Sequence, residues 1–227
     1  MEIYYALVPI LLILLLLWLY GYLLRASEAN WGRGWMNAMD GLVRLFVLRF
    51  HRAKLDSIAL PEIGPAVLVS NHVSGLDPLL LVVASRRPLR FIIATEQYER
   101  FGLKWLFRAA RCIPVDRNHR PERALRHARS ALRRGEVVAL FPHGKIHLDS
   151  DPPRKLKRGF AKLSQWGDVP VYPCRIDNVR GQSHTILALL MRGEEPSLRS
   201  FAATVCAEEA EAVCLEYVAA CIDGRQL

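Results

Sequence analysis

Between Ile3 and Leu24 the sequence has no charged residue, and after this stretch it has no internal repeat and no low-complexity segment. The five cysteines include no C-x-x-C pair and are odd in number, which argues against a zinc ribbon and against a disulfide framework. We therefore expect reduced, mostly buried thiols on the cytoplasmic side. The N-terminus also lacks the positive charge and the A-x-A site of a cleaved signal peptide.

The uncharged stretch is long enough to cross a bilayer. A helix needs about 20 apolar residues to span a hydrocarbon core of ~30 Å. Aromatic side chains suited to the membrane interface lie toward both of its ends: Tyr4, Tyr5, Trp18, Tyr20 and Tyr22. Arg25 and Arg33 follow, so the positive-inside rule predicts that the rest of the chain is cytoplasmic. We expect residues 1–25 to be a transmembrane anchor.

The formal net charge is +9, from 31 Lys and Arg against 22 Asp and Glu, which favours an anionic partner. The apolar N-terminus favours membrane phospholipids over nucleic acid as that partner. The segment Trp31–Arg52 mixes apolar residues with Arg and His, as in an amphipathic helix in the membrane interface or packed on the following domain. We assign residues 26–60 to this helix and a linker, and residues 61–227 to an α/β domain.

Short apolar runs alternate with helical patterns from residue 66 onward. The expected strands are Ala66–Ser70, Leu89–Ala94, Cys112–Val115, Val137–Phe141, Val169–Arg175 and Thr185–Met191. The expected helices are Pro78–Ser85, Tyr98–Ala110, Pro121–Arg134, Arg158–Trp166 and Ala207–Cys221. This order predicts an α/β fold, a mostly parallel sheet flanked by helices. Ligands of such sheets bind beyond the carboxyl ends of the strands.

The loop after the first expected strand carries acid–base chemistry. His72 and Asp77 are separated by four residues in a turn that contains Gly75. Asp77 precedes Pro78, which fits a helix N-cap followed by proline at the first helical position. This turn can bring the carboxylate to one imidazole nitrogen, and the other nitrogen can then take a proton from an alcohol. The alternative is that Asp77 is only a cap and His72 only a loop residue.

The string Asn71-His72-x4-Asp77 resembles the N-H-x4-D signature of the glycerolipid (lysophospholipid) acyltransferase family. The resemblance runs from about Pro65 to Arg175. A second block resembles Arg111–Arg117, and a third, F-P-E-G-T-R-S, is matched in part by Phe141–His147. The segments Lys155–Gly159 and Val169–Pro173 resemble the elements that follow.

This resemblance implies a transfer of a fatty acyl group from acyl-CoA or acyl carrier protein to a lysophospholipid hydroxyl, with no cofactor, metal or covalent acyl-enzyme. It implies that His72 is the general base and Asp77 its partner. The residues that it places at the substrates are Asn71, Ser74, Gly75, Arg117, Pro142, His143, Gly144, Lys145 and Lys157. Arg117 would bind the acceptor phosphate. His143 and Ile146 stand where the family carries Glu and Arg, which predicts a changed acceptor preference.

Other interpretations stay open at this point. His143, His147 and Asp149 could be zinc ligands of a hydrolase. A non-catalytic lipid-binding protein on the same scaffold would explain the altered third block. The sequence has two basic clusters. The first contains Arg86, Arg87 and Arg90, and the second contains Arg154, Lys155, Lys157 and Arg158. Each could contact anionic lipid or the phosphates of the donor, or could be solvated surface. Cys206, Cys214 and Cys221 share a helix face, which indicates core packing, with a metal or palmitoylation role as the alternative.

Overall fold

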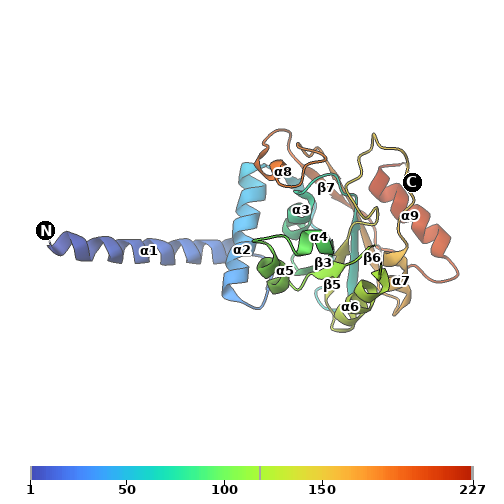
Figure 1. Cartoon of the computed structure of the whole chain (residues 1–227), viewed down its shortest axis with the longest axis horizontal. Helices are drawn as coiled ribbons and strands as arrows, with labels where there is room; N and C mark the ends of the chain where they lie inside the picture. Colours follow the sequence, from blue (N-terminus) through green and yellow to red (C-terminus); the bar gives the residue numbers. More distant parts are fainter. Residues whose placement is uncertain (1, 118, 226–227) are drawn as a thin grey trace.

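The computed structural model describes residues 2–117 and 119–225, so residue 1 of the expected anchor and residues 118 and 226–227 of the expected domain lie outside it. Helix α1 (Glu2–Ala26) extends away from a rounded α/β body (Figure 1). Its segment Leu7–Ala26 has a mean hydropathy of 2.5 and lies outside the folded core. Among the described residues it is the one helix long and apolar enough to cross a membrane. The side chains of Tyr4 and Tyr5 fall outside the description.

Helix α2 (Gly34–Leu45) crosses the end of α1 and continues into a short π-helical turn, η1 (Phe46–Phe50). The crossing is close: a Cβ on Gly41 would lie 1.9 Å from the carbonyl oxygen of Leu23. One face of α2 is buried and packs on α3, while Trp35 and Leu42 are exposed. The expected amphipathic segment is therefore helical, and it does pack on the domain.

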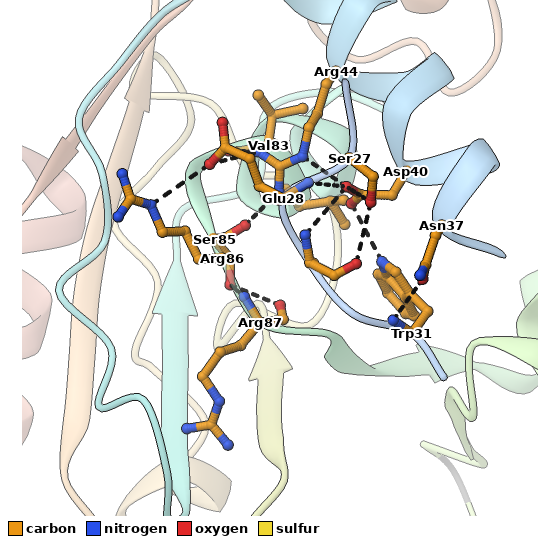
Figure 2. A network of polar contacts seen from close by, with 12 residues as sticks. Ser27, Glu28, Trp31, Asn37, Asp40, Arg44, Val83, Ser85, Arg86 and Arg87 are labelled. Carbon is orange, nitrogen blue, oxygen red and sulfur yellow. Dashed lines mark hydrogen bonds and ion pairs between the residues drawn. The ribbon is translucent and has the colours of Figure 1, made fainter. Parts of the chain in front are cut away.

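A buried ion pair holds this crossing to the domain (Figure 2). The Asp40 carboxylate accepts hydrogen bonds from Ser27, the backbone of Glu28, the Trp31 indole and, at 2.7 Å, the Arg44 Nε. The Arg44 guanidinium also donates to the backbone carbonyls at the end of α3, those of Val82, Val83 and Ser85. Arg44 therefore joins the crossing pair of helices α1 and α2 to α3.

Within the described residues, seven strands form one sheet in the order β1-β7-β6-β2-β5-β3-β4. The strands are β1 (Lys54–Leu55), β2 (Ala66–Ser70), β3 (Leu89–Ala94), β4 (Ile113–Val115), β5 (Val137–Leu140), β6 (Val171–Asp177) and β7 (Ser197–Ser200). All neighbours are parallel except β6 and β7. The expected mostly parallel sheet is confirmed.

Helices cover both faces of the sheet because the central strands are buried on both sides. In β2, Ala66 and Leu68 pack toward α3, whereas Val67 and Val69 pack toward α6, α7 and α9. The helices are α3 (Asp77–Ala84), α4 (Thr95–Tyr98), α5 (Lys104–Ala109), α6 (Pro121–Arg133), α7 (Gly159–Gln165), α8 (Leu187–Leu190) and α9 (Glu211–Asp223).

Three expectations about the helices, strands and cysteines are wrong. The helix expected at Tyr98–Ala110 is broken into α4 and α5 by a turn in which Gly102 has a φ of +80°. The segment Thr185–Met191, expected as a strand, contains the short helix α8. The structure also joins Cys206 and Cys214 in a disulfide bond, where free thiols were expected; their Cα atoms are 5.3 Å apart, within bridging distance.

Candidate active site

Asn71 fixes the end of β2 against its neighbour in the sheet. Its side-chain amide donates to the Ile176 carbonyl at 2.8 Å, and its Oδ1 accepts from the Ile176 N–H at 2.7 Å. Ile176 belongs to β6. Asn71 is buried, so it holds the start of the loop in place and does not face an open space.

His72 and Asp77 are paired. The Nδ1 of His72 lies 2.7 Å from the Oδ2 of Asp77. The same oxygen accepts from the backbone N–H groups of Val73 and Ser74, and Oδ1 accepts from the Ser74 hydroxyl. Since a carboxylate only accepts, Nδ1 of His72 is the donor in this bond, and Nε2 is the acceptor nitrogen of the neutral ring.

The expected N-cap role of Asp77 is wrong. Asp77 is the first residue of α3, and Leu76 occupies the capping position without a side-chain hydrogen bond. The carboxylate turns back over the loop, where His72, Val73 and Ser74 occupy its oxygens. Asp77 therefore serves the histidine and the loop, and not the helix end.

Phe141 supports the His72 ring by stacking on it. The two ring centroids are 4.1 Å apart, and the ring planes are inclined by 14°. The His72 carbonyl accepts from the backbone N–H of His147 at 2.8 Å. The histidine side chain keeps 20% of its surface exposed, whereas that of Asp77 has none. Sequence reasoning missed Phe141, although it is the first residue of the third block.

Arg117 connects the second and third sequence blocks. Its guanidinium donates to the carbonyl oxygen of Gly144, and it lies 3.7 Å from the Glu96 carboxylate. Gly144 has a φ of +78°, and the Lys157 side chain lies over it: a Cβ there would be 2.7 Å from the ammonium nitrogen. The two cations therefore meet at one glycine, which is a suitable place for an anion.

Pro142 and Gly75 are positioned by backbone contacts. The carbonyl of Pro142 accepts from the Lys157 N–H at 2.9 Å, which fixes the lysine beside Gly144. Gly75 donates its N–H to the His184 carbonyl at 3.0 Å. Pro142 and Ser74 are buried. They therefore position the backbone of the site and present no exposed side chain to a substrate.

The His143 side chain lies beside α9. Its ring is buried, with Nε2 3.5 Å from the Asp223 carboxylate in α9 and a ring centroid 4.5 Å from that of His147. Neither ring nitrogen has a hydrogen-bond partner within the described part of the chain. Burial raises the pKa of Asp223, but His143 and Arg225 outweigh it and leave that pKa below its usual value. The expectation that His143 lines the substrate pocket has no support in this geometry.

The two basic clusters differ. Arg87 donates to the carbonyls of Pro61, Gly64 and Gly135, and Arg90 is bound to Glu136 and to the carbonyl of Ala110. This first cluster is therefore structural, apart from the exposed Arg86. In the second, Arg154 and Lys155 line an open cavity of about 590 Å³ together with Lys145 and His147. Arg158 is paired with Glu211.

The zinc hypothesis is wrong for its three residues. The Asp149 carboxylate is held by Arg175 at 2.6 Å. His143 is buried beside Asp223, and His147 lies 3.5 Å from Asp151. Across residues 2–117 and 119–225, no three His, Cys, Asp or Glu side chains are grouped to hold a metal ion.

The sequence matches the model of the family described as Acyltransferase over residues 52–177. The fold resembles the crystal structure of the 1-acyl-sn-glycerophosphate (LPA) acyltransferase PlsC from Thermotoga maritima. The TM-score is 0.64 at 19% sequence identity, over 82% of this chain and 78% of the other. At that identity the likeness establishes the fold.

Two relatives illustrate the range of similar proteins. Over 140 residues the chain is 29% identical to a probable 1-acyl-sn-glycerol-3-phosphate acyltransferase of Mycoplasma genitalium, covering 59% of this chain and 52% of the relative. Over 109 residues it is 31% identical to an N-acylphosphatidylethanolamine synthase of Arabidopsis thaliana, covering 44% and 38%. The chain spans about half or less of the length of these curated relatives.

Proposed function

Because this chain belongs to the glycerolipid acyltransferase family, we propose that it transfers a fatty acyl group from a thioester to the hydroxyl of a lysophospholipid, with His72 as general base. The observation that carries the proposal is the bond of 2.7 Å between His72 Nδ1 and Asp77 Oδ2. It supports a histidine whose Nε2 is ready to accept a proton at the carboxyl end of β2.

The reaction needs no covalent enzyme intermediate. The acceptor O–H gives its proton to Nε2 of His72 as its oxygen attacks the thioester carbonyl carbon. The C–O bond forms, the tetrahedral intermediate collapses and the C–S bond breaks. The imidazolium returns the proton to the leaving thiolate, so that an ester and a free thiol are produced. Asp77 stabilises the positive charge on the imidazolium between the two transfers.

The cations beside the dyad suit two anionic substrates. We assign the acceptor phosphate to Arg117 and Lys157, which meet at Gly144. The open cavity beside Lys145, Arg154 and Lys155 suits the phosphates of acyl-CoA or the acidic surface of acyl carrier protein. Because His143 stands where the family carries a glutamate, the contact that the glutamate would make is missing. We therefore propose a lysophospholipid as the acceptor and leave its headgroup to experiment.

We propose that residues 1–25 anchor the chain in a membrane, that residues 26–60 join the anchor to the domain, and that the domain of residues 61–227 lies on the cytoplasmic side. The length and hydropathy of α1 support the anchor. The arginines that follow it support the orientation.

The test is acyl transfer by the full chain in detergent. Radiolabelled acyl-CoA or acyl carrier protein is offered with lysophosphatidic acid, zwitterionic lysophospholipids and a phosphate-free lysolipid. We expect His72→Ala to lose about 10²–10⁴-fold in rate on the preferred acceptor. His127→Ala, a change at an exposed histidine of α6, is the control and should match the wild type.

The altered third block, with His143 in place of glutamate, also suits a non-catalytic lipid-binding protein. One result would refute the acyltransferase proposal: the wild type transfers no acyl group to any acceptor from either donor, while the wild type and His72→Ala bind lysolipid equally. The lipid-binding protein would then be the better interpretation.

A further inference from the structure

An exposed aromatic and basic surface lies where α5 meets α2. The loop before α5 presents Phe101, whose side chain is fully exposed, and α5 presents Trp105, with 57% of its surface exposed. Large aromatic side chains are seldom left in water without a role when they lie together. This surface takes no part in the reaction described above.

The surface is continuous with the end of α1. The rings of Trp105 and Trp35 have centroids 5.7 Å apart, which joins α5 to the first turn of α2. Gly34, the residue before Trp35, lies against α1: a Cβ there would be 2.5 Å from the Tyr20 hydroxyl. Figure 1 shows α5 beside α2, on the side of the domain from which α1 leaves.

Tyr20 lies in the part of α1 suited to a membrane interface. Trp18 and Tyr22, on either side of it, are stacked with centroids 5.8 Å apart, and Arg25 follows in the last turn. Aromatic residues followed by arginine are typical of the headgroup level of a membrane helix. Trp35 and Trp105 therefore lie next to the level at which α1 would leave the bilayer.

The charge of the surface fits anionic lipid. Between α2 and α5 there is an open recess of about 640 Å³, lined by Arg33, Trp35, Lys104, Trp105 and Arg108 among others. Lys104 is paired with Glu99. Within the described residues, Arg33 and Arg108 have no carboxylate partner. A recess with uncompensated guanidinium groups between tryptophans combines the two attractions of an interfacial site, apolar burial and charge.

We propose that residues 99–108, with the first turn of α2, form a second membrane contact that binds the surface of an anionic phospholipid bilayer. The aromatic side chains enter the headgroup region, and Arg33 and Arg108 contact lipid phosphates. The domain is thereby held against the bilayer by its body as well as by its anchor. The proposal rests on the anchoring proposed for α1, but not on the transfer reaction.

The full chain, reconstituted in vesicles, tests this with one fluorescent label. The described native cysteines are buried or disulfide-bonded, so an introduced Phe101→Cys is the accessible thiol. The matched control is Glu216→Cys, an exposed position on α9, at the far end of the domain from α1 (Figure 1). Vesicles contain phosphatidylcholine alone or an equal mixture with phosphatidylglycerol, and some carry a nitroxide quencher at the headgroup.

We expect the label at position 101 to shift its emission to shorter wavelength and to be quenched, more strongly in the anionic vesicles, while the label at position 216 does neither. Adding Arg33→Glu and Arg108→Glu to the Phe101→Cys chain should remove the extra effect of anionic lipid, since each cation strengthens such binding roughly fivefold.

Vesicle-bound protein whose label at position 101 behaves like that at 216 would overturn the proposal, and so would a response to anionic lipid that survives both charge reversals. If the protein does not float with the vesicles, the proposed anchoring by α1 is refuted, and the second membrane contact is refuted with it. None of these results touches the transfer reaction, which is measured separately by acyl transfer in detergent.

Discussion

Gly75 and Thr185 touch through their backbones: a Cβ built on Gly75 would lie 1.8 Å from the carbonyl oxygen of Thr185. The contact is reinforced on either side, since the N–H of Gly75 donates to His184 and the N–H of Ser183 donates to Val73. The segment before α8 therefore lies directly on the loop between His72 and Asp77. No side chain fits between them.

Gly75→Ala is expected to push these segments apart and to lower the free energy of unfolding by about 1–3 kcal/mol, the usual cost of overpacking. Activity should fall as well, because the loop carries His72. Chemical unfolding in detergent and acyl transfer measure the two effects. Gly167→Ala is the control, since a Cβ at Gly167 meets nothing within 4 Å. Equal stability of the two variants would contradict the close contact.

Asp77→Asn should lower the rate at least about 100-fold, because an amide can no longer both accept from the histidine and stabilise the imidazolium. We expect kcat to fall more than KM rises, since Asp77 is buried and acts through His72. The matched change is Asp168→Asn, at an exposed residue whose φ of +49° suits asparagine. Unchanged kcat in Asp77→Asn would remove the dyad from the mechanism.

Arg44→Met leaves the Asp40 carboxylate buried without its ion pair. Breaking a buried pair in this way typically costs about 3–5 kcal/mol of stability. Arg86→Met removes an arginine that shares Glu28 with Arg44 but has 77% of its side chain exposed, so it should cost no more than about 1 kcal/mol. Unfolding midpoints in detergent measure both. A similar cost for the two variants would show that the buried network contributes little.

His51 should make stability depend on pH near neutrality. Burial lowers its pKa, and the hydrogen bond from its Nε2 to the Leu189 carbonyl, at 3.1 Å, only partly offsets this. Below about pH 6.5, His51 binds a proton in the unfolded chain, whereas in the folded chain its lowered pKa keeps it neutral to a lower pH. The free energy of unfolding therefore falls as the pH falls. His51→Gln should flatten this slope between about pH 7.5 and 5.5, as followed by chemical unfolding.

The exposed His127 supplies the comparison for His51. His127→Gln should keep the full slope of the wild-type protein, because the His127 side chain stays exposed to water in the folded chain. A slope that is the same in His51→Gln as in the wild type would mean that other groups cause the pH dependence.

The central part of the fold was predictable because it is local. Strands β2, β3 and β5 are short apolar runs, and the His72–Asp77 pair lies within one loop, so the sequence alone predicts both. The side of the sheet formed by β1 and β7 was not predictable. β1 has two residues, and β7 reads as SLRS, which has no apolar alternation; the pairing of β7 with β6 gives it its structure.

The sequence also does not predict the roles of residues whose contacts lie far away along the chain. The position of His143 in the third block suggests a side chain at the substrate. In the structure its ring packs against His147 and has Nε2 3.5 Å from Asp223 of α9, a contact that the sequence does not indicate. The role of Arg44 also depends on where α3 ends, 38 to 41 residues further along the chain.

The bond between Arg44 and the end of α3 has a geometric consequence. Helix α3 starts at Asp77 and ends at the carbonyls that Arg44 holds, so its eight residues, about 12 Å, separate the anchor from the dyad. Helix α3 is thus a rigid link with the helix crossing at one end and the His72–Asp77 pair at the other. With α1 in a bilayer, as proposed, this link would hold the pair at a constant distance from the crossing of α1 and α2.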